Sequence, residues 1–452
     1  MFAGLGGRFS AADDSHILST PALAAAAGHR RFVSLFTFRD KFPHSRHYGD
    51  NDRIWLAAPK ISTQLRVPFV KACHRKKETI LPKKMLNVAI PKGPSLLFNN
   101  LSASPNFLAY IHINRVFLVA TEGVAGAPDA GAAKFRELPY KVHDEFICTQ
   151  AKWIQIGGTV YLILTTTSGF QVWNAAGSNL LFFSPTSSMY DAVRNDTGGA
   201  EETSPDGDGN ADPEQSAAAV DRAREHGAEF LRGVAAIGES NCFAVGASTG
   251  DIFIYELRGD GSEIAFRQAL TRAKGAHASA ITAIASSTSH IVSAGDNGSI
   301  AVWSVQGWNL LCTFDGVSSR SASESRGFPC TGVATRADIV FGAFATGHLR
   351  LFSVAHRCCV VEIAAHARCI TALDLHPAQD LLVSVGEDSL VNVWNVGPGS
   401  GGTTEPELSS SRSVKDHLLT GVQFLESGQI ITSSYDRETL SVLQSGSQAS
   451  HK

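Results

Sequence analysis

The sequence predicts an all-β fold in which one short antiparallel unit repeats around an axis. Two observations lead to this prediction: one stretch holds three strand-length apolar runs in about thirty residues, and further copies of that stretch recur along the chain. The composition agrees with it. The chain has 452 residues, of which 44% are hydrophobic and 18% are charged, which suits one large soluble domain with tails.

The clearest unit runs from Ala365 to Asn395. Its three apolar runs lie within residues 370–375, 381–383 and 390–394, and each has the length and β-branched content of a strand. Proline and polar residues join the first two runs, and a glycine followed by two acids joins the second to the third. Three strands joined by tight turns form a meander, which needs similar neighbours to bury both of its faces.

Those neighbours are present. A second clear unit runs from Gly275 to Ser304, and an early, poorly marked unit runs from Leu96 to about Pro139. The remaining units are recognised by their last apolar residue, and the full series of such endings is Trp173, Tyr255, Trp303, Phe352, Trp394 and Leu443. Successive endings are 82, 48, 49, 42 and 49 residues apart. Seven units are therefore expected.

The unit at 365–395 resembles a WD40 repeat. Ala365-His366 stands where that family has Gly-His, Asp388 lies six residues before Trp394, and Trp394-Asn395 replaces Trp-Asp. The resemblance implies a single seven-bladed WD40-type β-propeller. Three further matches narrow it to one branch of the family: NNLS from Asn99, AHAR followed by I-x-ALDL from Ala365, and GED from Gly386.

The resemblance also implies a structural hydrogen-bond network within a blade. In well-formed family members a His, a Ser or Thr, an Asp and a Trp bond to one another, because a buried indole and imidazole each need a partner. The matching residues of the strongest unit are His366, Ser384, Asp388 and Trp394. In the Gly275–Ser304 unit the matches are His277, Ser293 and Trp303, with Asn297 at the Asp position.

Residues 1–84 differ from the rest of the chain. They show no repeat, and they carry fifteen Lys or Arg against six Asp or Glu, including the run Lys71, Arg75, Lys76, Lys77, Lys83 and Lys84. Nucleic-acid binding, nuclear import, a transit peptide and a solvated disordered tail are all compatible with basic charge. We expect residues 1–84 to be a disordered basic extension, and residues 85–452 to form the propeller.

Polar insertions interrupt the repeats. Residues 184–229 contain a strongly acidic stretch rich in Gly, Ser and Pro, and we expect them to form an acidic disordered insertion without a core. It accounts for the long first interval between unit endings. Smaller polar insertions are expected at Gly316–Arg326 and Gly397–Lys415.

The chain must also close into a ring. After Leu443 only a polar tail remains, so the last unit lacks an outer strand. Leu86, Val88 and Ile90 alternate with smaller or polar residues just before the first unit. We expect this segment to pair with the final unit and to fill its open edge.

Three motifs suggest chemistry but fail their context tests. Gly246-Ala-Ser248-Thr-Gly250 matches a nucleophile elbow, yet a strand follows it instead of a helix. Asp206–Asn210 begins like a calcium loop, but position six is Ala211. The set His44, His47, Cys73 and His74 lacks zinc-ligand spacing. We expect no catalytic, metal or cofactor-binding residues.

Propellers bind through the loops at their rims, because their strands are occupied in pairing. We therefore expect a non-enzymatic scaffold that mediates protein–protein interaction in the cytoplasm, with one or more protein partners and no membrane span. Arg368, His348 and Arg350 are candidate rim contacts. The alternative is a nucleic-acid-associated protein that uses its basic N-terminal tail.

Overall fold

The computed structural model describes residues 85–125, 134–139, 146–196, 228–259, 263–315, 328–397 and 406–443. The chain divides into two compact units, and all of these residues belong to the second, residues 64–452. The predicted disordered extension at 1–84 lies outside the described residues. So do residues 197–227 and 316–327.

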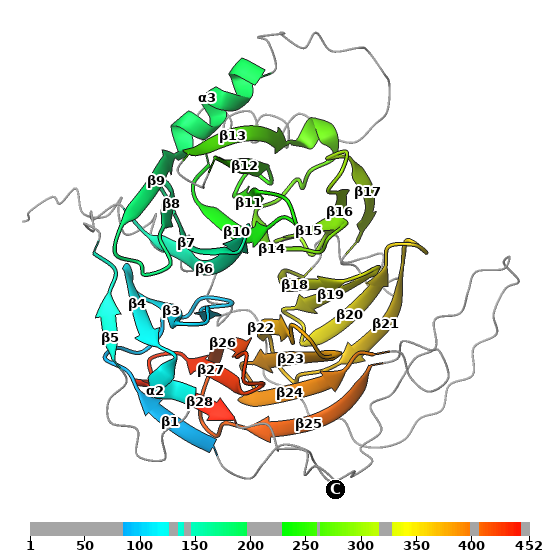
Figure 1. Cartoon of the computed structure of the whole chain (residues 1–452). Helices are drawn as coiled ribbons and strands as arrows, with labels where there is room; N and C mark the ends of the chain where they lie inside the picture. The colour runs from blue at the N-terminus through cyan, green and yellow to red at the C-terminus, as the bar shows by residue number, and fades with distance from the viewer. Residues whose placement is uncertain are drawn as a thin grey trace, which may run out of the picture. The chain divides into compact units, whose positions relative to one another are not determined.

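The described residues form seven four-stranded antiparallel sheets arranged as the blades of a β-propeller (Figure 1). The first three blades, in chain order, consist of β2 (Ser102–Ala103), β3 (Phe107–His112), β4 (Arg115–Ala120) and β5 (Phe135–Glu137); β6 (Cys148–Ile156), β7 (Thr159–Thr166), β8 (Gly169–Trp173) and β9 (Leu180–Pro185); and β10 (Leu231–Ala236), β11 (Cys242–Ala247), β12 (Ile252–Arg258) and β13 (Glu263–Leu270). The prediction of a seven-bladed propeller is confirmed.

Blades 4 to 6 follow the same order. They consist of β14 (Ile281–Ser286), β15 (His290–Gly295), β16 (Ile300–Ser304) and β17 (Leu310–Phe314); β18 (Cys330–Arg336), β19 (Ile339–Phe344), β20 (His348–Ser353) and β21 (Cys358–Ala364); and β22 (Ile370–Leu375), β23 (Leu381–Gly386), β24 (Leu390–Asn395) and β25 (Glu407–Ser413). The last of these corrects the expected polar insertion at Gly397–Lys415, because β25 supplies the outer strand of blade 6 and pairs with β24.

Blade 7 closes the ring with strands from both ends of the propeller. It consists of β26 (Leu419–Phe424), β27 (Ile430–Ser434), β28 (Thr439–Leu443) and β1 (Met85–Ala89). β1 pairs antiparallel with β28, from Met85 opposite Leu443 to Ala89 opposite Thr439. Val88 is buried while Asn87 is exposed, as the alternating pattern predicted. The predicted closure is confirmed.

The blades define two faces of the ring. In each blade the first and second strands are joined on one side, which we call the lower face, and in blades 1 to 6 the third and fourth strands are joined there too. The second and third strands are joined on the opposite side, the upper face, where the chain also passes from blade to blade. The first strands surround the axis, and each contacts the first strand of the next blade. The core lies between blades, in seven apolar clusters.

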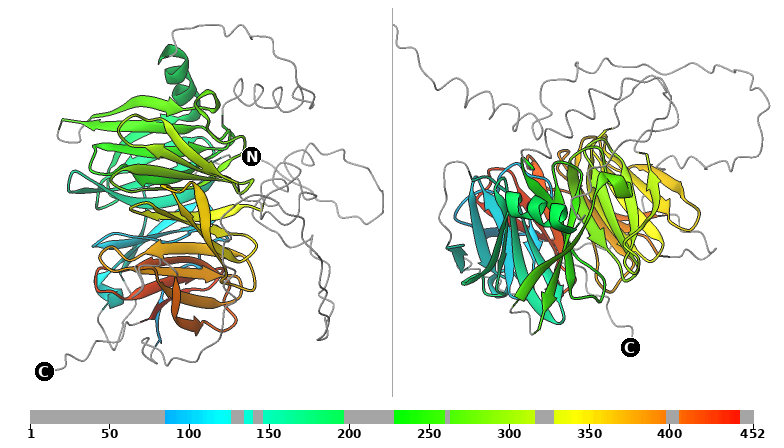
Figure 2. Two further views of the ribbon diagram at one scale, coloured as in Figure 1. Left: turned by 90° about the vertical axis from the view of Figure 1, so that its right-hand side faces the viewer. Right: turned by 90° about the horizontal axis from the view of Figure 1, so that it is seen from above.

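Short helices interrupt the connections. Helix α2 (Glu122–Ala125) follows β4, helix α3 (Thr186–Asp196) follows β9, and a single 3₁₀ turn, η2, spans Arg272–Lys274. Figure 2 shows α3, in green, at the outside of the ring. The expectation of disorder throughout 184–229 is wrong for residues 184–196. Met189 and Tyr190 are buried there in the cluster that blades 2 and 3 share.

Residues 95–101 form no strand, although most of them are apolar. The apolar sequence SLLFNNL predicts a strand, but only Ser102 and Ala103 are in β2. Asn99 has a φ of 51°, a left-handed conformation that a strand does not accommodate. Its hydrogen bonds run to other blades instead of to a neighbouring strand of its own.

Candidate functional site

Blade 6 contains a continuous chain of buried hydrogen bonds. His366 Nδ1 lies 2.9 Å from Asp388 Oδ1, and His366 Nε2 lies 2.8 Å from Ser384 Oγ. The indole nitrogen of Trp394 donates to the same Ser384 oxygen at 3.0 Å. Since a carboxylate only accepts, Nδ1 of the imidazole carries the hydrogen and Nε2 accepts one from Ser384. The network therefore links the blade entry, the second strand, the turn and the third strand.

Asp388 is the charged end of that chain, and its side chain is 8% exposed. Burial by itself raises the pKa of Asp388, but the hydrogen bonds that its carboxylate accepts from His366 and from backbone N–H groups together leave that pKa below its ordinary value. The backbone N–H groups of Ala367 and Leu390 add to this effect at 2.9 and 3.2 Å. The carboxylate is thus held by the fold and is not aimed at solvent.

Blade 4 builds the same chain with neutral groups. His277 Nε2 lies 2.8 Å from Ser293 Oγ, to which the Trp303 indole donates at 3.1 Å. His277 Nδ1 lies 2.7 Å from Ser299 Oγ, and that hydroxyl donates to Asn297 Oδ1 at 2.7 Å. Asn297 therefore reaches the histidine only through Ser299. Burial lowers the pKa of His277 to about 4, so the imidazole is neutral at pH 7.

In blade 3 a residue from helix α3 forms the corresponding side-chain hydrogen bonds. The Tyr190 hydroxyl lies 2.7 Å from Thr249 Oγ1, which donates to Asp251 Oδ2 at 2.8 Å in the turn before β12. Ser248 lies in that turn between two strands and accepts a hydrogen bond from the Glu229 N–H at 2.9 Å. The structure gives Ser248 a turn position instead of a nucleophile elbow.

The three candidate rim residues differ in exposure and position. Arg368 is exposed on the upper face, in the connection between β21 and β22. His348 is half-buried at the start of β20, with Nδ1 3.0 Å from Thr346 Oγ1. Arg350 is a correction, because it is 7% exposed, donates to Glu362 at 2.7 Å and lies 4.5 Å above the Phe344 ring. Its place in the middle of β20 holds the guanidinium inside blade 5.

Threonines join the blades around the axis. Five of the first strands carry threonine as their second residue: Thr149, Thr282, Thr331, Thr371 and Thr420. Four of these, all but Thr420, donate their hydroxyl to the first carbonyl of the next blade's first strand. The motif of an apolar or Cys residue followed by Thr was available in the sequence, and it marks the start of the first strand in these five blades.

Residues 97–100, which we call the channel segment, lie among these first strands. Asn99 donates its backbone N–H to the Thr371 carbonyl and its side-chain amide to the Thr331 carbonyl, both at 3.0 Å. Asn100 donates its backbone N–H to the Thr420 carbonyl at 2.9 Å. One short segment thus bonds to blades 5, 6 and 7. The NNLS match begins at this point.

Arg232 anchors the channel segment from the opposite side. It stands at the threonine position of blade 3, is 1% exposed and donates to the Phe98 carbonyl at 2.6 Å. The same guanidinium donates to the Thr282 and Thr149 carbonyls at 3.1 and 3.3 Å. Burial lowers the pKa of Arg232 to about 10. The chain's own atoms therefore occupy the axis near the upper face.

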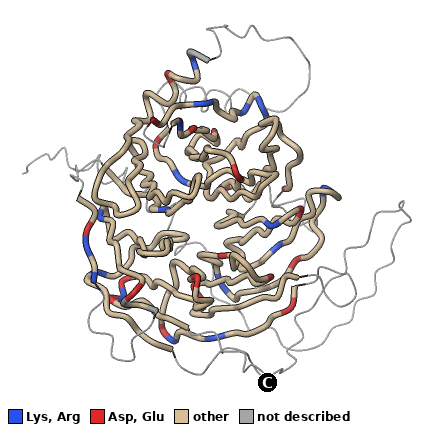
Figure 3. Tube along the Cα trace, in the orientation of Figure 1, with Lys and Arg blue, Asp and Glu red and all other residues tan. Residues whose placement is uncertain are grey.

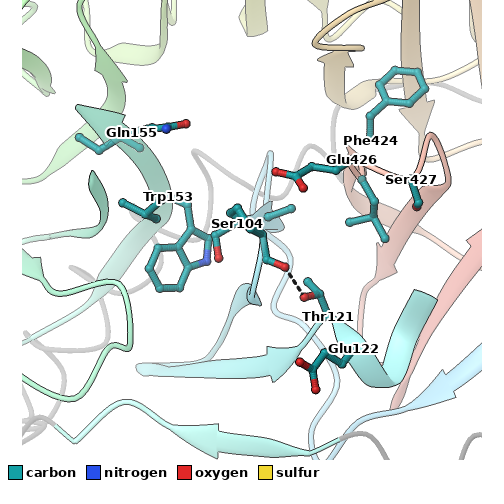
Figure 4. A pocket seen from close by; sticks show the side chains of 13 residues that line it. Ser104, Thr121, Glu122, Trp153, Gln155, Phe424, Glu426 and Ser427 are labelled. Atoms are coloured by element: carbon teal, nitrogen blue, oxygen red, sulfur yellow. Dashed lines mark hydrogen bonds between the residues drawn. The ribbon is translucent and has the colours of Figure 1, made fainter. Parts of the chain in front are cut away.

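A pocket opens on the lower face where blades 7, 1 and 2 meet. Its volume is about 440 Å³, within the range of small-ligand and side-chain pockets. Trp153, Val160 and Phe424 give it apolar walls, and helix α2 and the β26–β27 turn bring Glu122 and Glu426 to it. Figure 4 shows Trp153 and Glu426 on opposite sides of Ser104 among the residues that line the pocket.

Two features of the pocket lack partners. The Trp153 indole N–H is buried and has no hydrogen-bond partner within the described residues. Its ring stacks on Phe107, with centroids 6.5 Å apart. Glu122 and Glu426 are exposed, and neither forms an ion pair with a cation in the described part of the chain. No sequence pattern predicted this pocket, because its residues come from three blades.

The described residues offer neither a metal site nor a membrane-spanning helix. No group of three or more His, Cys, Asp or Glu in the described ranges could hold a metal ion. None of the described helices is long and apolar enough to cross a membrane. The weighed zinc set at His44, His47, Cys73 and His74, and the calcium-like Asp206–Asn210, lie outside the described residues.

Comparison with known proteins places the chain among WD-repeat proteins. The family model described as WDR54 matches residues 216–443, just over half of the chain. The Rattus norvegicus protein "WD repeat domain 54" is 27% identical over 292 residues, which cover 62% of this chain and 73% of that protein. The Homo sapiens protein "WD repeat-containing protein 54" is 27% identical over 290 residues, covering 62% and 73%.

Solved structures share the fold. A chain of the structure titled "Crystal Structure of Mitotic Checkpoint Complex" superimposes with a TM-score of 0.53 and 13% sequence identity, over 86% of this chain and 99% of that one. At this identity the likeness shows the propeller architecture alone.

Proposed function

Because this chain belongs to the WDR54 family of WD40 proteins, we propose that it is a non-enzymatic scaffold that binds protein partners. The NNLS, AHAR and GED matches had indicated this branch of the WD40 proteins. The WD40 propeller is a protein-interaction fold. The observation that carries the proposal is the filling of the axis by the channel segment and Arg232. With the axis filled near the upper face, the rims become the surfaces available to a ligand.

The titratable groups named below lie inside the ring and form structural hydrogen bonds, which supports the same proposal. Asp374, whose pKa burial raises to about 6, accepts the Phe424 N–H of the next blade at 2.8 Å. Asp388 and His277 are committed to the blade networks. An enzyme needs several such groups converging on one accessible pocket. In the pocket described above, the titratable side chains are the two glutamates.

We place the partner site on the lower face, at the pocket. A test is affinity enrichment from cell extract with the full chain and two matched variants. Ser427→Arg puts a bulky cation at the pocket, and Glu239→Arg does the same in the equivalent exposed turn of blade 3. Partners should be retained by the wild type and by Glu239→Arg, and lost with Ser427→Arg. Equal retention by all three would overturn the lower-face assignment.

The nucleic-acid alternative rests on the net charge of +9 in residues 1–84. Figure 3 shows Lys and Arg interspersed with Asp and Glu around the described ring, so the basic tail would have to supply the binding. Such binding weakens steeply with salt and disappears in a chain that starts at Met85. Fluorescence anisotropy with a labelled duplex between 50 and 200 mM salt tests it. The cytoplasmic location belongs to the proposal too, and imaging of the tagged full chain checks it.

A further inference from the structure

The pocket has the chemistry of a site for a basic side chain on a polypeptide. Trp153, Val160 and Phe424 offer apolar walls to an aliphatic stem, and Glu122 and Glu426 offer carboxylates to a cationic head group. Two like charges near one pocket, with no cation of their own in the described residues, attract a third charge of opposite sign.

The chain carries such a segment immediately before its first strand. Residues 71–84 hold six Lys or Arg against a single acid, Glu78. They join the ring at Met85, which pairs with Leu443, the last residue of the third strand of blade 7. Third strands run toward the lower face, so the basic run enters the ring on the face that bears the pocket.

The attachment point also lies on the same side of the ring as the pocket. Leu86 packs against the cluster between blades 7 and 1, and that cluster includes Val124 of α2 and the pocket residue Leu425. Lys76 and Lys77 are eight or nine residues from Met85, a reach of up to about 25–30 Å for an extended chain. A tether of this length gives an effective concentration on the order of millimolar, which favours the chain's own segment over a free peptide.

We propose that the basic segment at residues 71–84 docks across the lower-face pocket of its own chain, with its Lys or Arg side chains paired to Glu122 and Glu426. The segment then acts as a built-in competitor that a protein partner must displace. This regulatory role rests on the proposed function, since the partner is taken to use the same pocket. The docking itself does not depend on any partner.

Zero-length carbodiimide cross-linking of the full chain tests the docking. The reagent joins a lysine amine to a carboxylate only where the two already touch, and mass spectrometry identifies the pair. We expect links from Lys71, Lys76, Lys77, Lys83 or Lys84 to Glu122 or Glu426, with a yield that falls severalfold between 50 and 500 mM salt. Glu239, exposed in the equivalent turn of blade 3, is the matched control and should stay unlinked.

Mixing isotopically light and heavy protein separates the occupants. Links confined to one isotope show the chain's own segment, whereas hybrid links show a second copy and overturn the proposal. Links to Glu239 as abundant as those to Glu426, or none to either pocket glutamate, also overturn it. Replacing Glu122 and Glu426 by Gln, both exposed and so expected to leave the fold intact, should remove the links while thermal unfolding stays unchanged.

Partner binding then separates this inference from the proposed function. Lys76→Glu with Lys77→Glu should increase partner retention severalfold, because the competitor is weakened. Pocket-dependent partner retention without pocket cross-links would overturn the docking alone. Pocket cross-links together with partner retention that Ser427→Arg does not affect would support the docking and overturn the lower-face assignment.

Discussion

Blades 6 and 4 place the same residue types in the same positions but end their hydrogen-bond chains differently. In blade 6 the histidine meets the Asp388 carboxylate at 2.9 Å, and in blade 4 it meets the Ser299 hydroxyl at 2.7 Å. Both chains run from an indole through a serine to an imidazole. The network therefore needs only a hydrogen-bond acceptor for the histidine at its end, and that acceptor is charged in blade 6 and neutral in blade 4.

The largest expected effect tests what the two blades share. Trp394→Ala and Trp303→Ala each remove a buried indole, 5% and 0% exposed, and should each cost about 3–5 kcal/mol of unfolding free energy. Urea unfolding measures both. Tyr435→Ala, at a residue 46% exposed, is the control and should cost far less. A loss in only one blade would break the equivalence of the two networks.

The next effect tests the difference between them. Asp388→Ala leaves the buried His366 Nδ1 without its acceptor and should cost on the order of 1–3 kcal/mol. Asn297→Ala should cost less than about 1 kcal/mol, because Ser299 still bonds to His277. Thermal unfolding of the two variants side by side checks this order. Equal losses would mean that the carboxylate adds nothing to the network.

Lowering the pH should reduce the stability that the neutral network of blade 4 contributes. Its histidine has a folded pKa of about 4 and an ordinary value of 6.5, so the unfolded chain takes up the proton first. The stability that neutral His277 contributes is complete above pH 6.5 and is lost as the pH falls toward 4. At pH 5.5 the loss should be about 1 kcal/mol. Urea unfolding of wild type and His277→Gln from pH 7.5 to 5 measures it, and an identical slope in both would contradict the assignment.

The smallest effect extends the comparison to blade 3. Tyr190→Phe keeps the ring against Phe253 but removes the hydroxyl that lies 2.7 Å from Thr249. The expected cost is about 0.5–1.5 kcal/mol. Hydrogen exchange should rise at the turn before β12 and stay unchanged in blade 6. Uniform exchange over the whole ring would show that α3 does not support that turn in particular.

Sequence alone was enough to predict the repeat, the seven blades, the closing strand, the network residues of blade 6 and, in blade 4, His277, Ser293 and Trp303 but not Ser299. These features are local or periodic: Asp388 lies six residues before Trp394, and the apolar alternation of Leu86, Val88 and Ile90 predicts a strand without knowledge of its partner. Their physical signal is contained in short windows of the chain.

Other features depend on tertiary contacts: the bonds of the channel segment, the burial of Arg350 and Arg232, the folding of α3 and the lower-face pocket. Asn99 and Arg232 are 133 positions apart in the sequence, and the bonds of the channel segment reach four blades because the ring brings all first strands to one axis. The pocket likewise needs the turn of the last blade beside the first two. Such contacts depend on how the ring closes, and no short stretch of sequence encodes them.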